Sequence, residues 1–332
     1  MVRNRHAHIL RRVAAGLLAA LLTLSGGRAV ASPGTVPYTD ALGEHVAVSL
    51  PVHRAVFFVL YELVPVLGVW DRTVGVARWA YDNDLVTQSK PDIRSIPSVG
   101  SGSDVNMEAL LRLKPDLVVT WTFKPEQARF MEGRGFPVVG VYPDSIAQLC
   151  DVMRFLGKAF EREDRMERAI GDMETLFQLI RQRVALIPEA ERKKILYLDS
   201  KPTTVSGRLG VTNDMITLIG AHNAASVGGV RNADVPLEKI IAWNPDVIFI
   251  WGNARYGVSD LTNDARWRLI PAVREGRVYK APEWSTWSPR LAPYALWMAA
   301  MTYPERFRDV NLDTVVEDFH KKVFGVPGKA WH

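Results

Sequence analysis

The chain has a single cysteine, Cys150, among its 332 residues. One thiol excludes an intramolecular disulfide and a metal centre built from several cysteines. The histidines beyond residue 31 are scattered and show neither His-x-His nor His-x-x-x-His spacing, which is the spacing that paired histidine ligands usually have. We therefore predict that the protein has no cofactor and forms no metal site by itself.

Common signatures of catalysis are missing as well. The sequence contains neither Gly-x-Gly-x-x-Gly nor Gly-x-Ser-x-Gly, and no Ser, His and Asp stand in the context of a catalytic triad. Asp82 and Asp84 are the one acid pair that could serve acid–base chemistry, and their polar surroundings predict solvated side chains. We expect no enzyme. A two-lobed α/β enzyme stays the alternative class, and an exported adhesin or structural protein is a third.

A short apolar run near the N-terminus predicts export. Four arginines precede residues 13–24, a run too short to span a bilayer. The Ala-Val-Ala sequence at residues 29–31 offers a cleavage site before Ser32. We predict that residues 1–31 are a secretory signal peptide. No cysteine stands at the cleavage point to carry a lipid, so we expect a soluble, periplasmic mature protein.

The positive charge of the chain belongs to this leader. It holds five arginines and no acidic residue, so its removal lowers the formal charge from +5 to zero. Binding to the phosphates of a nucleic acid depends on a surplus of basic side chains. We therefore expect no nucleic-acid partner, and we expect a monomer.

The most informative feature that is present is one long internal repeat. Residues 107–121 return as residues 237–251, at an offset of 130 positions. The matched pairs are Glu108 with Glu238, Pro115 with Pro245, Asp116 with Asp246, and Trp121 with Trp251. Solenoid repeats recur many times at periods of about 20–50 residues, so a single repeat at this spacing indicates two similar lobes instead.

Each copy of the repeat predicts a helix that runs into a buried strand. A proline ends the helix, and short apolar runs follow it at residues 117–120 and 247–250. Such runs are typical of central strands in a covered parallel sheet. Ligands gather at the carboxyl ends of these strands, so Trp121 and Trp251 are expected to face a cleft. For either tryptophan alone, a place at the edge of the core is an equal alternative.

The order of the remaining elements predicts the architecture. A hairpin within residues 32–51 precedes strands and helices that alternate, which is the pattern of a parallel sheet. Residues 165–186 carry an apolar stripe at helical spacing, and a helix of that length measures about 33 Å. It could bridge two lobes and would keep ligand-linked closure small.

We thus predict an α/β fold of two Rossmann-like lobes with parallel central sheets, joined by a long rigid helix, with a ligand cleft between them. The boundaries are an N-terminal lobe at 32–145, a helical linker at 146–188 and a C-terminal lobe at 189–332.

Several short motifs now resemble a known family. In chain order they are Asp40-Ala-Leu-Gly43, His53-Arg-Ala-Val56, Leu67-Gly68, Val74-Gly-Val76, Pro97-Ser-Val-Gly100, Asn106-Met-Glu108, Pro115-Asp-Leu117 and Ser288-Pro-Arg290. No single block is specific, but together and in this order they resemble the cluster III substrate-binding proteins of ABC importers. The resemblance covers nearly the whole mature chain. It implies transport of a ferric siderophore, haem, cobalamin or, in some members, molybdate or tungstate.

The resemblance also gives the repeated glutamates a role. In the cobalamin-binding member, the glutamate in the matching helix of each lobe forms a salt bridge with arginines of the membrane permease. Carried over by motif, these residues are Glu108 and Glu238. The partner implied is an ABC permease in the inner membrane. Two solvated helix charges are the alternative.

Loops at the carboxyl ends of the strands should line the cleft. The candidate ligand-binding residues are Arg78, Trp79, Tyr81, Ser101, Gly102, Trp121, Arg208, Arg231, Trp251, Trp284 and Trp287. The segment 100–103 precedes a helix and could hold a small anion, although a flexible turn with a helix cap is the simpler alternative. Arg290 opens a helix after a proline, and we expect it to be a structural ion-pair partner.

Arginine and tryptophan dominate this set. The arginine fork suits carboxylate, catecholate or oxyanion oxygens, and tryptophan offers a flat apolar wall. An anionic chelate with an organic shell fits both, so any metal would arrive already wrapped. We expect an iron(III) complex of a siderophore-like chelator, with haem or a corrinoid as the next alternative and molybdate or tungstate as the third.

Overall fold

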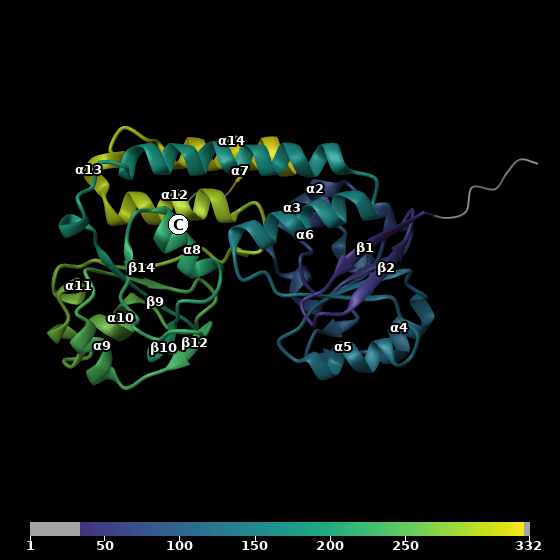
Figure 1. Ribbon diagram of the computed structural model, residues 1–332, viewed down its shortest axis with the longest axis horizontal. Helices are drawn as coiled ribbons and strands as arrows, with labels where there is room; N and C mark the ends of the chain where they lie inside the picture. The colour runs from purple at the N-terminus through teal and green to yellow at the C-terminus, as the bar shows by residue number, and fades with distance from the viewer. Residues whose placement is uncertain (1–33, 329–332) are drawn as a thin grey trace, which may run out of the picture. The chain divides into compact units, whose positions relative to one another are not determined.

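The computed structural model describes residues 34–328. The predicted signal peptide, residues 1–31, lies outside the described residues. The chain from Thr35 onward belongs to one compact unit. In it, two separate β-sheets, each with its own helices, form an N-terminal and a C-terminal lobe (Figure 1). Within residues 34–328 we find no helix whose length and apolar character would let it cross a membrane.

A small antiparallel hairpin opens the described chain, as predicted. It consists of β1 (Thr35–Thr39) and β2 (His45–Ser49). The buried carboxylate of Asp40 closes the turn, because Oδ1 accepts hydrogen bonds from the backbone N–H groups of Leu42 (2.8 Å) and Glu44 (3.0 Å). Its other oxygen accepts a bond of 3.1 Å from the N–H of Gly140, which ties the hairpin to the N-terminal lobe.

The N-terminal lobe contains a parallel sheet of four strands. Their order is β4 (Thr73–Val76), β3 (Ala55–Phe57), β7 (Leu117–Trp121) and β8 (Val138–Val141). The connecting elements are α2 (Leu63–Leu67), α3 (Asp84–Ser89), the hairpin β5 (Gly100–Ser101) and β6 (Asp104–Val105), α4 (Met107–Leu113) and α5 (Pro125–Glu132). The strand β7 agrees with the apolar run predicted at residues 117–120 to within one residue.

The C-terminal lobe repeats this plan with an addition. Four parallel strands run in the order β11 (His222–Asn223), β9 (Lys194–Leu198), β13 (Val247–Ile250) and β14 (Val278–Lys280). Two further strands, β10 (Thr204–Ser206) and β12 (Asn232–Asp234), extend the sheet, and β10 pairs antiparallel with both β9 and β12. The predicted parallel sheet is therefore incomplete here. The link from β9 to β10 is too short for the crossover that a parallel neighbour needs, so the chain returns antiparallel.

Among the described helices of this lobe, α12 and α14 are long and the others are short. In chain order, the helices are α8 (Val211–Leu218), α9 (Leu237–Trp243), α10 (Val258–Thr262), α11 (Pro271–Arg274), α12 (Leu291–Thr302), α13 (Pro304–Phe307) and α14 (Leu312–Phe324). The helix α12 is buried along nearly its whole length. This explains why its sequence is apolar on all sides and not amphipathic.

The structure explains the repeat in terms of local geometry. The repeated helices are α4 and α9, and each ends at a residue with left-handed backbone, Lys114 (φ 46°) or Asn244 (φ 53°). These two positions differ by the repeat offset. The left-handed residue ends the helix, and Pro115 or Pro245 follows it directly, so the chain turns into the next strand at the same point in both lobes.

The repeated aspartates fix the neighbouring strands. The carboxylate of Asp116 accepts hydrogen bonds of 2.8 Å from the backbone N–H groups of both His53 and Arg54, just before β3. In the other lobe the carboxylate of Asp246 accepts one of 2.7 Å from the N–H of Lys194, the first residue of β9. The Pro-Asp pairs are therefore structural, and they align the starts of adjacent strands.

A long helix joins the lobes, as predicted. After α6 (Ile146–Ala159), the helix α7 (Glu163–Val184) has 22 residues, a length of about 33 Å. It starts two residues before the predicted position. It packs against α2 and α6 on one side of the molecule and against α12, α13 and α8 on the other, and Figure 1 shows it beside α14 along both lobes.

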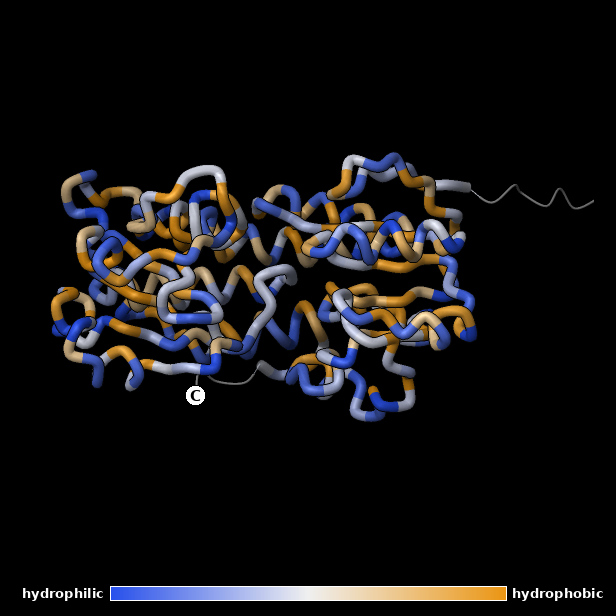
Figure 2. Tube along the Cα trace, turned by 90° about the horizontal axis from the view of Figure 1, so that it is seen from below, coloured by the Kyte–Doolittle hydropathy of each residue, from blue (hydrophilic) through white to orange (hydrophobic). Residues whose placement is uncertain are grey.

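The hydrophobic core beneath α7 is continuous through both lobes. It joins Phe57 and Val119 of the first sheet to Phe177 of α7 and to Ile195 and Phe249 of the second sheet. The opposite faces of the two sheets pack into separate smaller cores. Hydrophobic segments accordingly recur in both lobes (Figure 2). Because both faces of each sheet are covered, the strands read as unbroken apolar runs in the sequence.

Candidate functional site

Loops of the two lobes meet directly. After β8, Asp144 receives two hydrogen bonds from Arg231 of the C-terminal lobe, Nε to Oδ1 and Nη2 to Oδ2, each of 2.6 Å. The guanidinium carbon of Arg231 lies 4.0 Å from the ring centre of Tyr142, and Tyr142 contacts Trp287 edge to face at 4.8 Å. We call these four residues the seam. They place the carboxyl edge of the first sheet against loops of the second lobe.

A second group gathers around the β5–β6 hairpin of the N-terminal lobe. Arg78 lies over the ring of Trp79, 4.7 Å from its centre, and 3.9 Å from the carboxylate of Asp104 in β6. Between the two short strands, Gly102 touches the indole of Trp121, and a Cβ at this glycine would lie 1.9 Å from Nε1. The structure therefore brings four predicted site residues together, and glycine is required at position 102.

Trp121, one of the two tryptophans of this group, has an unused hydrogen-bond donor. Its Nε1–H is buried and has no hydrogen-bond acceptor among the described residues. Trp79 is 53% exposed, and Phe123, whose ring lies 6.0 Å from that of Trp121, is 65% exposed. A buried donor without an acceptor costs about 1–3 kcal/mol. This edge of the lobe thus combines exposed aromatic surface, one accessible arginine and an unused N–H group.

The segment 100–103 is an ordered hairpin, whereas a flexible turn was the simpler expectation. Ser101 is buried, and the side chain of Asn106 caps α4 by accepting a hydrogen bond of 3.0 Å from the N–H of Ala109. The expected helix cap is therefore correct. Because Asn106 already accepts from the first turn of α4, the helix N-terminus gives little support to the idea of a small-anion site there.

Two predicted residues, Tyr81 and Trp284, are engaged in contacts with neighbouring side chains or backbone. The hydroxyl of Tyr81 donates to the backbone oxygen of Ile96 at 2.8 Å, and Arg94 lies 5.0 Å from the centre of its ring. Trp284 is buried, 4.4 Å from the guanidinium carbon of Arg290. Their contacts indicate packing roles for both side chains, although Tyr81 shares the short helix Arg78–Tyr81 with Arg78 and Trp79 of the β5–β6 group.

The other two predicted residues of the C-terminal lobe follow its strands. Trp251 comes directly after β13, is half-buried and packs against the cores on both faces of the sheet. Arg208 lies in the loop after β10, with an exposed side chain and a backbone N–H that donates to the oxygen of Val227 at 3.2 Å. That Trp251 and Arg208 contact a ligand stays a prediction.

Arg290 has the structural role that we expected. It is 1% exposed. It donates two hydrogen bonds of 2.7 Å to Asp84, one of 3.3 Å to Glu62, and one of 3.1 Å from Nε to Nε2 of His320. Ser288 adds a bond of 2.6 Å to Glu62. We call these five residues the Arg290 cluster. The carboxylates of Glu62 and Asp84 belong to the N-terminal lobe, so the cluster joins that lobe to α12 and α14 of the C-terminal lobe.

The prediction for Asp84 is wrong. Its carboxylate is not solvated but bound to Arg290. Burial favours the protonated form of Asp84, but the hydrogen bonds and charge of Arg290 outweigh it, so the pKa of Asp84 is lowered. Burial, together with the nearby charge of Arg290, lowers the pKa of His320 to about 4. The imidazole is then neutral at pH 7 and accepts the bond from Arg290.

Most of this cluster has no local signal in the sequence. Glu62 and His320 show no motif or repeat, and 226 positions separate Ser288 from its partner Glu62. Only the Ser-Pro-Arg block drew attention to Arg290.

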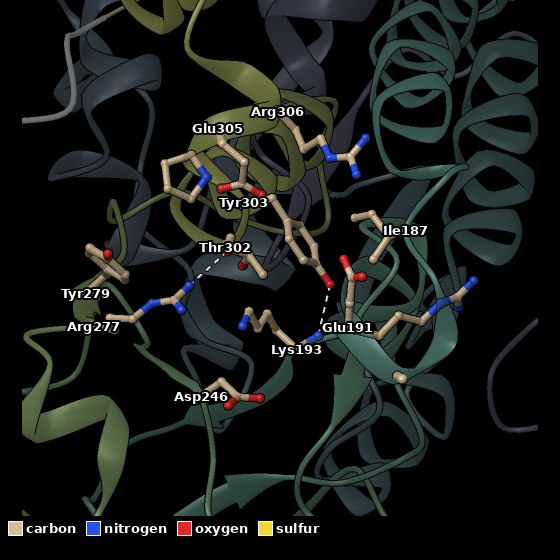
Figure 3. Close-up of a pocket in the computed structure, with 13 residues that line it drawn as sticks. Ile187, Glu191, Lys193, Asp246, Arg277, Tyr279, Thr302, Tyr303, Glu305 and Arg306 are labelled. Atoms are coloured by element: carbon tan, nitrogen blue, oxygen red, sulfur yellow. Dashed lines mark hydrogen bonds between the residues drawn. The ribbon is translucent and has the colours of Figure 1, made fainter.

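A cavity of about 800 Å³ lies elsewhere in the C-terminal lobe (Figure 3). Its lining includes Lys193 and Asp246, which stand at the amino ends of β9 and β13. The hydroxyl of Tyr303 accepts a hydrogen bond of 3.0 Å from the N–H of Lys193, and Arg277 donates to the oxygen of Thr302 at 2.8 Å. None of the predicted ligand residues lines this cavity. It lies at the sheet edge opposite to the loops that were expected to bind a ligand.

The two predicted docking glutamates occupy equivalent exposed positions. Glu108 lies in the first turn of α4 and forms a 2.8 Å ion pair with Arg112, and Glu238 lies in the first turn of α9. Both could reach a partner protein. Among residues 34–328, no group of three or more His, Cys, Asp or Glu side chains is placed to hold a metal ion.

Comparison with known proteins places the chain in context. Residues 54–283 match the family described as periplasmic binding protein. The chain is 24% identical over 329 residues to the molybdate-binding protein MolA of Haemophilus influenzae, which covers 86% of this chain and 90% of that protein. It is 25% identical over 166 residues to the vitamin B12-binding protein of Salmonella paratyphi A, covering 49% of this chain and 62% of that one.

Solved structures share the fold. The structure of Helicobacter pylori CeuE in complex with Ni-His superposes with a TM-score of 0.78 and 27% identity, covering 88% of this chain and 96% of that one. These comparisons support the arrangement of two α/β lobes.

Proposed function

The chain belongs to the periplasmic binding protein family, and on that premise we propose that it is the substrate-binding component of an ABC importer. It captures an anionic metal chelate, foremost an iron(III) complex of a siderophore-like chelator, and hands it unchanged to a permease. The observation that carries this proposal is the group around the β5–β6 hairpin, where Arg78 stacks on the exposed Trp79 beside Gly102 and Trp121.

The chemistry of that group suits a wrapped metal ion. The guanidinium of Arg78 presents a fixed fork of N–H donors to carboxylate or catecholate oxygens. The rings of Trp79 and Phe123 present apolar surface to the organic shell of a chelator. The related CeuE protein, 27% identical, is described in complex with Ni-His, which supports a metal complex as the class of ligand.

Molybdate is the second candidate. It is favoured by the similarity to MolA, which extends over 90% of that protein. A tetrahedral oxyanion would need arginine forks more than aromatic surface. Arg208 and Arg231 are the arginines of the C-terminal lobe that we assign to it.

Ligand titration tests the proposal. The mature protein is titrated with ferric citrate, a ferric hydroxamate, haemin, cobalamin and molybdate, and tryptophan fluorescence is recorded. We expect the iron complexes to bind, and Arg78→Gln to weaken them by about 10- to 100-fold through loss of charge-assisted hydrogen bonds. Arg134→Gln is the matched control, because Arg134 also lies over an exposed ring, that of Phe130 at 3.5 Å.

Binding of molybdate alone would select the second candidate. Failure of all five probes, together with catalysis on a nucleotide or an ester, would favour the enzyme class instead. Equal losses in Arg78→Gln and Arg134→Gln would remove the β5–β6 group from the binding site.

We further propose that Glu108 and Glu238 dock the protein on the permease. The double variant Glu108→Arg/Glu238→Arg should bind ligand normally and abolish uptake, because two attractive charges become repulsive. The control is Glu317→Arg on α14, where Glu317 pairs with Lys321. Normal uptake by the double variant would contradict the assignment.

Export is the last part of the proposal. We propose that residues 1–31 are removed and that the mature protein is periplasmic without a lipid anchor. Mass spectrometry of the exported protein should then give an N-terminus at Ser32 and no added lipid. A mature chain that retains residues 1–31 would contradict it.

A further inference from the structure

Within residues 34–328, two sets of ion pairs connect the lobes, and in both sets the same lobe supplies the arginine. The arginines, Arg231 and Arg290, belong to the C-terminal lobe, and the carboxylates belong to the N-terminal lobe. Their surroundings differ. The side chains of Arg290 and Glu62 are each 1% exposed, whereas that of Arg231 is 44% exposed and that of its partner Asp144 is 18% exposed.

Exposure makes the seam pair exchangeable. An ion pair that water can reach adds little to stability, because solvent and salt compete for both charges. Arg231 also ends an exposed loop that contains Gly228 and Gly229, and nothing lies within 4 Å of a Cβ built on either glycine. Open space therefore surrounds the tip of this loop, while Val227 and Val230 stay anchored through their backbone oxygens, which accept hydrogen bonds from the N–H groups of Arg208 (3.2 Å) and Leu209 (3.1 Å).

The surroundings hold the guanidinium in place through such an exchange. The ring of Tyr142 lies 4.0 Å below it, and Trp287 supports that ring from the other lobe. The backbone oxygen of Arg231 accepts a hydrogen bond of 2.7 Å from the N–H of Gly207. Arg231 therefore stays oriented, with its two N–H donors directed at whichever pair of oxygens lies opposite.

We propose that Asp144 is a built-in competitor for the ligand: in the free protein its carboxylate occupies the place on Arg231 that an anionic group of the ligand takes. Partner exchange at Arg231 loosens the seam and admits the ligand. This inference rests on the proposed function. Its consequence is selectivity, because a ligand must offer two oxygens at carboxylate spacing to replace Asp144, and a neutral ligand gains nothing at this residue.

The first test needs no ligand. Hydrogen exchange is measured across residues 226–231 in the free mature protein and in Asp144→Asn. We expect faster exchange in the variant, because the bridge to the N-terminal lobe is weakened. The matched control is Asp309→Asn, which removes a carboxylate from another exposed bidentate pair, with Arg183 at 2.7 and 2.8 Å. Unchanged exchange in residues 226–231 of Asp144→Asn would overturn the proposal.

The second test measures affinity. Asp144→Asn should bind ferric citrate and molybdate about two- to fivefold more tightly than the wild type, which corresponds to the small contribution of an exposed pair. Asp199→Asn controls for net charge, because Asp199 lies near Tyr142 but pairs with Asn232 at 3.3 Å. Equal gains in both variants, or no gain in Asp144→Asn, would overturn the proposal.

A third arm separates this inference from the proposed function. If the wild type binds neither ferric citrate nor molybdate, the proposed substrate class fails, and exchange is then compared in sodium sulfate and in sodium chloride at equal ionic strength. Faster exchange of residues 226–231 in sulfate alone supports displacement of Asp144 by an anion with paired oxygens. Equal exchange in both salts overturns it.

Discussion

The Arg290 cluster and the seam use the same chemistry in opposite environments. In both, an arginine of the C-terminal lobe donates two short hydrogen bonds to one aspartate of the N-terminal lobe, Asp84 or Asp144. The two arginines differ in burial, and this difference decides whether each can change its partner. A buried arginine cannot leave its carboxylates without stranding charges in a poorly polar interior, whereas an exposed one can exchange partners with water or with a ligand.

The difference assigns each contact a mechanical role. The Arg290 cluster fixes the lobes near α12 and α14, on the same side as the long helix α7. The seam joins them at the strand ends, where we propose that ligand binds. A rigid helix and a buried ion cluster together predict that closure is small, so that loosening at the seam changes access more than it changes the angle between the lobes.

The largest expected effect comes from removing the buried arginine. Arg290→Met leaves Glu62 and Asp84 without their counter-ion, and loss of one partner from a buried ionic group costs about 3–5 kcal/mol. Urea unfolding of the variant and the wild type measures this loss. If Arg290→Met were no less stable than Arg231→Met, the contrast between the two sites would be wrong.

Acid should weaken the buried site. The pKa of His320 is about 4 in the folded protein and 6.5 for a free imidazole, so the unfolded chain binds more protons between these values. The contribution of His320 to the free energy of unfolding is fully present above pH 6.5. It is lost as the pH drops to about 4, and the loss is about 3 kcal/mol in total. The lowered pKa of Asp84 acts in the same direction, below pH 3.8.

The histidine part is isolated by substitution. The stability difference between the wild type and His320→Gln should shrink by about 3 kcal/mol from pH 7 to pH 4, as measured by urea unfolding. His53→Gln is the control, because His53 is exposed. A constant difference between the wild type and His320→Gln across this range would show that His320 is not held neutral by the cluster.

The smallest effect is expected at the seam. Arg231→Met should cost less than about 1 kcal/mol, because its pair with Asp144 is open to solvent. Unfolding in low and high salt measures this loss, which should shrink further at 1 M NaCl as the charges are screened. A cost that equals that of Arg290→Met, or that is insensitive to salt, would contradict the assignment of the seam as an exchangeable contact.

Much of the fold could be predicted because the relevant signals are local. A proline after an amphipathic segment ends a helix, and a branched apolar run predicts a buried strand, so the repeat at residues 107–121 and 237–251 located α4, β7, α9 and β13. The stripe along residues 165–186 located α7 to within two residues at either end. The antiparallel strands β10 and β12 were missed because their short residue runs carry no distinct periodicity.

The candidate site was harder to predict than the fold. Position after a strand selected Arg78, Trp79, Gly102 and Trp121, which the structure places around the β5–β6 hairpin. The same rule also selected Trp284, which is buried beneath Arg290. Position along the chain predicts which residues follow a strand. It does not predict whether another element covers their side chains.

The sequence by itself determined most of the elements, the duplication and the helix that bridges the lobes, because each helix or strand reflects a local pattern and the duplication repeats that pattern 130 positions later. Only the tertiary structure decided which arginine is buried and which is exposed. The partners of Arg290 lie 206 and 228 positions away, and Arg231 meets Asp144 across 87. Over such separations the pairing depends on how helices and sheets pack, and local periodicity carries no information about that packing.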